Sequence, residues 1–112
     1  MKTVLVTGGF DPLHSGHIRY FNQAKKLGDK LIVGLNSDDW LRRKKGQPFM
    51  NLENRASIIV ELGMVDEVII FNDSDNTSCH AIQQVLHTHE SVIFANGGDR
   101  LLSNIPEYEK YQ

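Results

Sequence analysis

Short apolar runs alternate along this chain with segments whose apolar residues recur at helical spacing. The runs cover residues 2–7, 30–35, 67–71 and 91–95. Their length and their content of β-branched residues are typical of buried strands. A parallel pair of strands needs a crossover connection long enough to hold a helix, and the intervening segments supply one each time. The sequence therefore predicts an α/β fold, namely a Rossmann-like parallel sheet with helices on both faces.

Four helices are expected between the strands, at residues 15–27, just after 36–38, at 52–62 and at 77–87. Gly28 follows the first of these, where a left-handed C-terminal cap belongs. Trp40, in the short second helix, is interpreted as a packing residue. The basic run at residues 42–47 (RRKKGQ) is interpreted as a mobile loop.

Length and composition limit the classes of function. A chain of 112 residues fits one domain over residues 1–112. A net charge of −2 argues against a general nucleic-acid binder. Cys79 is the only cysteine, so an intrachain disulfide is impossible and a reducing cytoplasm fits best. No apolar run approaches membrane-spanning length, and the N-terminus lacks a signal-peptide pattern. We expect a cytoplasmic protein without nucleic-acid or membrane partners.

The turn between the first strand and the first helix reads TGGFDPLHSGH, from Thr7 to His17. Gly8 and Gly9 lack side chains, so the backbone can turn sharply and approach a ligand. The following helix directs free N–H groups and the positive end of its dipole to the same place, which favours a phosphate. His14 and His17 are three residues apart, so both imidazoles can face this site, and Gly16 leaves a phosphate room to approach.

Other chemistries fit this turn less well. A zinc site would need a third ligand at suitable spacing, and one cysteine cannot supply a structural cluster. The residues do not form the G-x-G-x-x-G pattern of dinucleotide-binding folds. Two further segments, 36–38 and 96–99, follow the second and fourth strands, and ligands of parallel sheets bind at the carboxyl ends of the strands. The convergence of these segments predicts a binding site at that edge.

Residues 9–17 (GFDPLHSGH) resemble the G-F-D-x-x-H-x-G-H signature of the cytidylyltransferase-like nucleotidyltransferases. The resemblance continues through residues 26–29 (KLGD), 33–38 (VGLNSD), 65–68 (VDEV) and 97–99 (GGD), and Arg55 is similar to an arginine on the family's following helix. The resemblance implies attack of a substrate phosphate oxygen on the α-phosphorus of a nucleoside triphosphate, with release of pyrophosphate and without a covalent enzyme intermediate.

The resemblance also implies roles for individual residues. His14 and His17 would contact the triphosphate, Lys44 or Lys45 would close over it, and Arg55 would bind phosphate. The nucleotide site would further comprise Gly8, Gly9, Phe10, Asp11, Gly16, Gly97, Gly98 and Asp99. In that site Asp11 would orient ligand or metal, and Asp99 would contact ribose or base. Mg²⁺ would arrive with the nucleotide rather than in a protein cage, and a homodimer is expected.

Substrate identity divides the family. Some members use CTP with glycerol phosphate, phosphocholine or phosphoethanolamine, whereas heptose-phosphate adenylyltransferases use ATP. Residues 36–38 and 97–99 resemble the heptose type, and residues 65–68 the glycerol-phosphate type, although Gly63 replaces a basic residue of the latter. We expect transfer of CMP, with AMP transfer to a sugar phosphate as the alternative.

The C-terminal segment departs from the family pattern. Family members usually continue to a fifth strand and an I-S-T-S-type motif that reads the base, and nothing from Leu101 to Gln112 resembles it. We expect this part to be shortened, remodelled or replaced by a partner. A nucleotide-binding module without turnover is therefore a further alternative.

Overall fold

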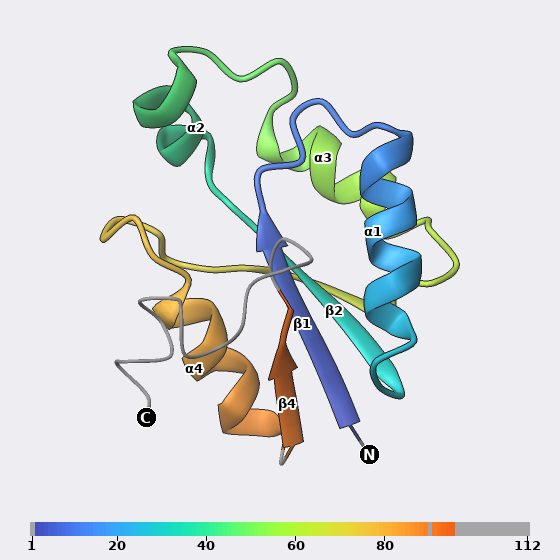
Figure 1. The fold of residues 1–112 in the computed structure, drawn as a ribbon. Coiled ribbons are helices and arrows are strands. Elements are labelled where there is room, and N and C mark those ends of the chain that lie inside the picture. Colours follow the sequence, from blue (N-terminus) through green and yellow to red (C-terminus); the bar gives the residue numbers. More distant parts are fainter. Residues whose placement is uncertain (1, 90, 96–112) are drawn as a thin grey trace.

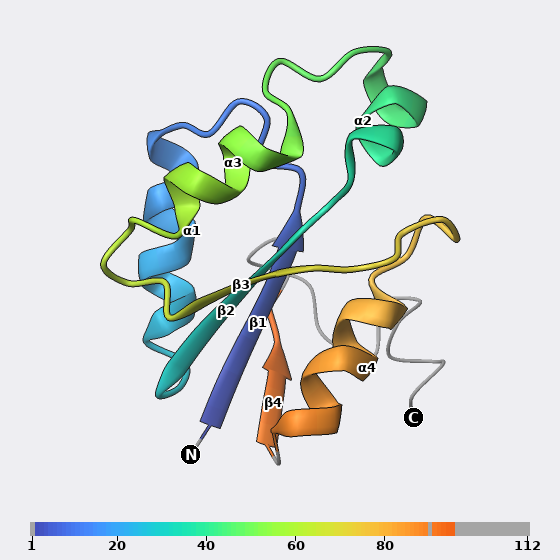
Figure 2. The ribbon, with the colours of Figure 1, turned by 180° about the vertical axis from the view of Figure 1, so that it is seen from behind.

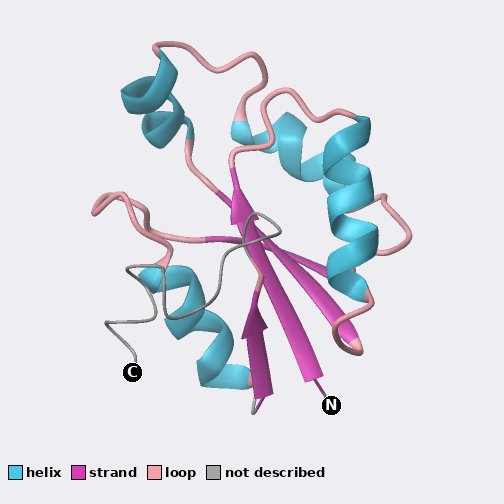
Figure 3. Cartoon of the chain, viewed as in Figure 1, coloured by secondary structure: helices cyan, strands magenta, loops and turns pink. Residues whose placement is uncertain are grey.

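A computed structural model shows the predicted alternation of strands and helices, and it describes residues 2–89 and 91–95. Each predicted strand and each predicted helix is present, with small shifts at the ends (Figures 1 and 3). In chain order the elements are β1 (Lys2–Gly8), α1 (Ser15–Lys25), β2 (Lys30–Leu35), α2 (Asp38–Lys45), α3 (Leu52–Ile59), β3 (Glu67–Ile70), α4 (Cys79–Thr88) and β4 (Ser91–Phe94).

The strands form one parallel sheet in the order β3-β2-β1-β4. β1 is central: Val6 lies opposite Val33 of β2, and Leu5 lies opposite Phe94 of β4. The chain therefore proceeds from β1 to one side, through β2 to β3, and returns to the other side of β1 with β4. In open parallel sheets this reversal opens a crevice at the carboxyl ends of the strands, which is where ligands bind.

Helices cover both faces of the sheet, as predicted (Figures 1 and 2). Successive residues of a strand point to opposite faces. Val4 and Val6 accordingly pack with Phe21 of α1 and Ile59 of α3, whereas Leu5 packs with Ile82 of α4 and its neighbours. The two apolar cores hold β1 rigidly between them, and the position of the loop that follows β1 is thereby fixed.

The basic run was wrongly interpreted as a loop, because most of it belongs to α2. Ser37 caps this helix by accepting the N–H of Trp40 at 3.0 Å. Asp38 and Asp39 lie in the first turn, and four basic residues lie in the last turn, as the helix dipole favours. Gly46, with a φ of 96°, ends the helix. Lys44 and Lys45 are therefore held on a helix at the edge of the sheet.

Gly28 was wrongly predicted as a left-handed cap. The last turn of α1 ends at Lys26 in a right-handed conformation, and Gly28 has no positive φ. Its role is close approach: a Cβ atom at this position would lie 2.8 Å from the carbonyl oxygen of Lys2. The neighbouring N–H of Asp29 donates to that same oxygen at 2.8 Å, which joins the turn to the start of β1.

Candidate functional site

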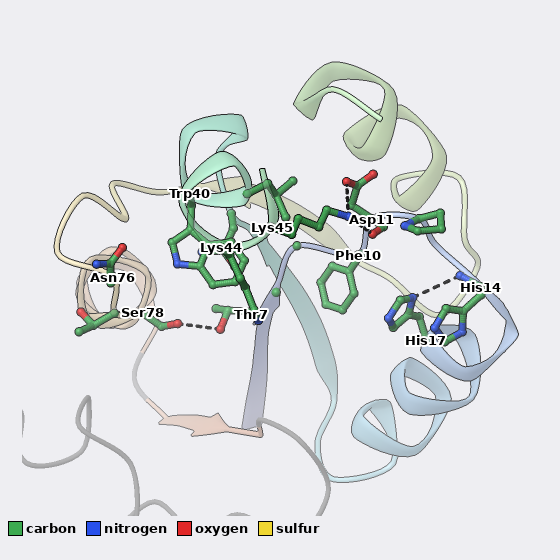
Figure 4. Close-up of a pocket in the computed structure, with 16 residues that line it drawn as sticks. Thr7, Phe10, Asp11, His14, His17, Trp40, Lys44, Lys45, Asn76 and Ser78 are labelled. Atoms are coloured by element: carbon green, nitrogen blue, oxygen red, sulfur yellow. Dashed lines mark hydrogen bonds and ion pairs between the residues drawn. The ribbon is translucent and has the colours of Figure 1, made fainter. Parts of the chain in front are cut away.

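A cleft of about 560 Å³ lies at the carboxyl end of β1. Residues 7–12, the two histidines at the start of α1, residues of α2 and residues 76–78 line it (Figure 4). Thr7, Gly8, Gly9 and Asn36 are among the lining residues. The segments that follow β1 and β2 therefore meet, as the sequence predicted. The third predicted segment, with Gly97, Gly98 and Asp99, lies outside the described residues.

The sharp bend of the loop occurs at Phe10, whose φ is 50°, and not at either preceding glycine. The Phe10 ring turns back over Gly8, where a Cβ atom would lie 2.9 Å from it. The buried ring also packs edge-on against His17 and Phe21, with centroids 5.1 and 5.0 Å away. A left-handed backbone is costly for a bulky residue. The loop tolerates it here because the ring is clamped between the glycine and the first turns of α1.

The two histidines form a reciprocal cap at the start of α1. The N–H of Gly16 donates to Nδ1 of His14 at 3.0 Å, and the N–H of His14 donates to Nδ1 of His17 at 3.2 Å. The rings stack with their centroids 3.9 Å apart. In most helices a hydroxyl or carboxylate performs this capping. Here the imidazoles perform it, and they remain on the wall of the cleft (Figure 4).

This cap determines which nitrogen carries hydrogen. Nδ1 of each ring accepts a backbone N–H, so the hydrogen of the neutral imidazole sits on Nε2. Burial, followed by the nearby His14, holds the pKa of His17 below its usual value. Both rings therefore offer fixed Nε2–H donors, and His17 offers its donor without a positive charge. Gly16 supports this arrangement, because a Cβ atom there would lie 2.9 Å from the His14 ring.

Asp11 is held by protein groups at the edge of the cleft, and the role expected for it, orienting ligand or metal, remains a prediction. Its side chain is fully buried and accepts the N–H groups of Phe49 and Met50, each at 2.7 Å. Lys45 completes the group with an ion pair at 2.8 Å. Burial acts to raise the pKa of Asp11, but these hydrogen bonds and the lysine outweigh it and hold the pKa below the usual value. Asp11 thereby fixes residues 49–50 and one of the two candidate lysines.

Lys44 differs from Lys45 in its surroundings. Its ammonium lies over the ring of Trp40, 4.6 Å from the centroid, and it has no ion-pair partner among the residues that the structure describes. An aromatic face attracts a cation without neutralising it. Lys44 is therefore the lysine of the pair whose charge remains available in the cleft. Trp40, interpreted as packing, also lines the cleft, next to Gly9.

Arg55 lies beneath the cleft and does not line it. Its side chain is fully buried and donates to the carbonyl oxygens of Gly9, Asn36 and Met50 at 2.8–3.0 Å. It also pairs with the carboxylate of Asp38 at 2.7 Å. The guanidinium thus joins the glycine loop, the end of β2, the segment before α3 and the start of α2. The phosphate contact expected for Arg55 remains a prediction, and the contacts present are with protein groups.

Sequence reasoning missed the segment after β3. Asp73 is 4% exposed and accepts hydrogen bonds from Asn36, from the Ser37 backbone and from the Ser37 hydroxyl. This contact brings residues 76–78 against the cleft, where the Ser78 hydroxyl lies 2.8 Å from that of Thr7. The sequence analysis assigned no role to this segment. The rule that ligands bind at the carboxyl ends of strands applies to β3 as well, and it would have pointed to this segment.

The described residues hold neither a metal-binding cluster nor a membrane-spanning helix. Residues 2–89 and 91–95 contain no group of three or more His, Cys, Asp or Glu side chains placed to hold a metal ion. Within the same residues, no helix has the length and apolar character needed to cross a bilayer.

Comparisons with known proteins agree with this geometry. Residues 5–111 match the family model described as cytidylyltransferase-like, and the match runs past residue 101, where the sequence resemblance was expected to end. The bifunctional protein HldE of Haemophilus influenzae (strain PittGG) is 40% identical over 114 residues, which cover 88% of this chain and 24% of that protein. HldE of Geobacter sulfurreducens is 34% identical over 93% of this chain and 20% of its own length. The chain therefore spans about a quarter or less of these curated relatives.

A solved structure gives the same result for the fold. The lipopolysaccharide core biosynthesis protein from Thermoplasma volcanium GSS1 superimposes with a TM-score of 0.76 at 33% sequence identity, over 98% of this chain and 83% of that one. The family match covers nearly the whole sequence, and it includes the histidine pair and the glycine loop. The chain belongs to the cytidylyltransferase-like family.

Proposed function

We propose that this protein transfers a nucleotidyl group from a nucleoside triphosphate to a phosphorylated small alcohol or sugar and releases pyrophosphate. The observation that carries the proposal is the reciprocal cap of His14 and His17. It directs two fixed N–H donors at a cleft that also holds the ammonium of Lys44, which has no ion-pair partner within residues 2–89 and 91–95. Donors preorganised in this way stabilise charge that develops on phosphate oxygens in a transition state.

The chemistry requires little from the protein beyond position and charge. An oxygen of the acceptor phosphate forms a bond to the α-phosphorus, and the bond from that phosphorus to the pyrophosphate oxygen breaks. A phosphate monoester is already a competent nucleophile, so no general base is needed. His14 and His17 would donate to the triphosphate oxygens, and Lys44 would neutralise charge on the phosphates. Mg²⁺ would enter as part of the nucleotide substrate, as expected, since the carboxylate of Asp11 is already occupied by Lys45 and two N–H groups.

The relatives favour a sugar phosphate as acceptor. The solved neighbour is named for lipopolysaccharide core biosynthesis, and the curated relatives compared above are HldE proteins. Both agree with the resemblance of residues 36–38 to the heptose type. The sequence analysis predicted CTP as the nucleotide, whereas the resemblance to the heptose type supports ATP. We therefore propose AMP transfer to a sugar phosphate as the first reaction to test. The homodimer that the resemblance implies and the cytoplasmic location expected from the single cysteine both remain predictions. Light scattering on the purified protein checks the homodimer.

The decisive experiment measures pyrophosphate release from CTP and from ATP with a panel of acceptors. The panel contains six- and seven-carbon aldose 1-phosphates, glycerol 3-phosphate and phosphocholine. Release that depends on an acceptor supports the proposal, and the better nucleotide identifies the transferred group. Calorimetric binding of a triphosphate without release from any acceptor would instead indicate a nucleotide-binding module. The absence of both binding and release would remove the proposal.

A further inference from the structure

A tyrosine on α1 holds the carboxyl end of β4. The hydroxyl of Tyr20 donates to the carbonyl oxygen of Ala95 at 2.7 Å. Tyr20 follows His17 by three residues, which places both on the same side of the helix. Ala95 comes directly after the last residue of β4. One hydrogen bond therefore joins the helix that carries the histidine pair to the point where the chain leaves β4.

This hydrogen bond lies where the pairing of β1 with β4 stops. β1 pairs with β2 as far as the last residue of β1, whereas its pairing with β4 ends at Leu5 and Phe94. The N–H of Ala95 still donates to the carbonyl oxygen of Leu5 at 3.0 Å. In a continued parallel ladder, the carbonyl oxygen of Ala95 would then accept the N–H of Thr7. It accepts the Tyr20 hydroxyl instead, and the ladder ends there.

The end of this ladder is a position at which parallel sheets bind ligands. The chain places β2 and β3 on one side of β1 and β4 on the other, and the crevice of such a sheet opens at this reversal. Thr7 and Gly8, the residues of β1 just beyond the ladder, line the cleft. After Ala95 the chain continues to residues 97–99, for which the family resemblance implies contacts with the nucleotide.

We propose that Tyr20 is a positioning residue for the nucleoside part of the triphosphate. By binding the carbonyl oxygen of Ala95, it ends the β1–β4 ladder and fixes the direction in which the chain leaves β4. It does so without lining the cleft itself. This inference rests on the proposed function, since it concerns the nucleotide of that reaction.

The hydroxyl of Tyr20 can be removed without disturbing the phosphate end of the cleft. The Tyr20 ring packs against the larger core and lies 5.9 Å from the ring of Phe21, which is fully buried. A phenylalanine at position 20 keeps this packing and lacks only the donor. The cap formed by His14 and His17 uses backbone N–H groups and imidazole nitrogens alone. Tyr20→Phe should therefore leave both imidazoles in place.

The test is calorimetric binding of ATP, CTP and inorganic tripolyphosphate, each with Mg²⁺, to the original protein and to Tyr20→Phe. Tripolyphosphate lacks a nucleoside, so its Kd should stay within about twofold. The nucleotide that the original protein binds better should lose about tenfold in affinity, as for one lost hydrogen bond. In turnover its KM should rise about tenfold, with kcat and the KM for the acceptor within about twofold. Equal weakening of nucleotide and tripolyphosphate, or an unchanged nucleotide affinity, would overturn the proposal.

Lys30→Gln is the matched control for a general loss of stability. Lys30 begins β2, at the edge of the sheet opposite the cleft, and its ammonium lies 3.4 Å from the carboxylate of Glu67 and 3.2 Å from Nε2 of His89. Thermal unfolding should show that both variants fold, and Lys30→Gln should bind the nucleotide as the original protein does. If Lys30→Gln weakens nucleotide binding as much as Tyr20→Phe, the effect is one of stability and the positioning role falls.

Failure of the proposed function gives a different result. If no acceptor yields pyrophosphate but Tyr20→Phe still weakens the nucleotide and spares tripolyphosphate, the reaction is absent and the positioning role stands. If pyrophosphate is released and Tyr20→Phe changes neither the Kd nor the KM of the nucleotide, the reaction stands and the inference falls. An original protein that binds no nucleotide removes both.

Discussion

The backbone N–H of His14 donates to Nδ1 of His17, and the two imidazole rings stack 3.9 Å apart. This contact is one half of a reciprocal cap, and the N–H of Gly16, which donates to Nδ1 of His14, is the other half. Together the two contacts satisfy N–H groups at the start of α1 that would otherwise be free. They also place the hydrogen of each neutral ring on Nε2, the nitrogen that a phosphate would meet. Capping and phosphate binding can be separated by substitution, because other residues cap helices without an imidazole.

His14→Asn and His17→Gln should keep the helix and lose the reaction. Asparagine is a good N-cap, and glutamine at the third helical position completes a capping box. We therefore expect melting temperatures close to that of the original protein and a fall in turnover of about two orders of magnitude. His14→Ala is the matched control: it removes the cap as well and should lower stability by about 1 kcal/mol. Thermal unfolding measures the effect on stability, and pyrophosphate release measures the effect on turnover. Full turnover in His14→Asn would show that His14 acts only as a helix cap.

The lowered pKa of His17 makes a prediction for the acid side of the pH profile. Burial, and then the neighbouring His14, disfavour the protonated ring in the folded protein. The unfolded chain therefore takes up this proton first, near its ordinary pKa of about 6.5. Stability should be level with pH above about 6.5 and should fall from there toward the lower pKa of the folded state.

Activity should follow the same ring. Protonation places a hydrogen on Nδ1 and breaks the contact with the His14 N–H, so kcat/KM should fall only below about pH 6.5. Initial rates between pH 5 and 8 would show this limb, and His17→Gln should remove it. A limb that lies above pH 6.5 would show that another group controls the reaction.

The local sequence pattern was sufficient to predict those parts of the fold that depend on residues close together in the sequence. The β-branched runs became β1 and β2 within one residue of their predicted ends, because short apolar runs of this kind have few other stable conformations. The histidine pair lies on the cleft because a spacing of three residues returns to the same face of a helix. Charge was misleading at residues 42–45, where a basic run that resembles a loop is stabilised by its position at the end of a helix dipole.

The buried polar contacts could not be predicted in this way. Arg55 meets carbonyl groups 46 and 19 residues away in sequence, and Asp73 meets Ser37 from 36 residues away. Such partners depend on how the finished elements pack. A single sequence carries no periodic signal for them, so the sequence analysis linked the arginine only to a phosphate and assigned no role to the aspartate.

The two neighbouring lysines should give opposite results when each is replaced by glutamine. Lys44→Gln removes the ammonium that has no ion-pair partner among the described residues, so kcat/KM should fall by about two orders of magnitude with little change in melting temperature. Lys45→Gln removes the ion pair of buried Asp11, so it should lower the melting temperature and raise the pKa of Asp11 toward its usual value. Unfolding curves at pH 7 and pH 4 and initial rates separate the two. Loss of turnover in Lys45→Gln at unchanged stability would exchange their roles.

Substitutions of Arg55 test whether the site depends on a buried cation that holds the protein together without contacting a ligand. Arg55→Met leaves three carbonyl groups and a carboxylate without their donor. The free energy of unfolding, measured in urea, should therefore fall by about 3–5 kcal/mol. Asp38→Asn is the milder partner variant, because Asp38 is 26% exposed and asparagine can still accept a hydrogen bond from the guanidinium. The free energy of unfolding of Asp38→Asn should fall by about 1–2 kcal/mol.

The hypothesis that Arg55 binds phosphate and the hypothesis that it only joins protein groups make different predictions for Arg55→Lys. A lysine keeps the positive charge but cannot reproduce the fork of donors that reaches four acceptors. If the contacts in the structure define its role, Arg55→Lys should be destabilised nearly as much as Arg55→Met. Turnover would then fall because the Gly9 carbonyl and the start of α2 lose their common anchor. If the arginine serves the phosphate instead, the lysine variant should keep its stability and show only a raised KM for the triphosphate.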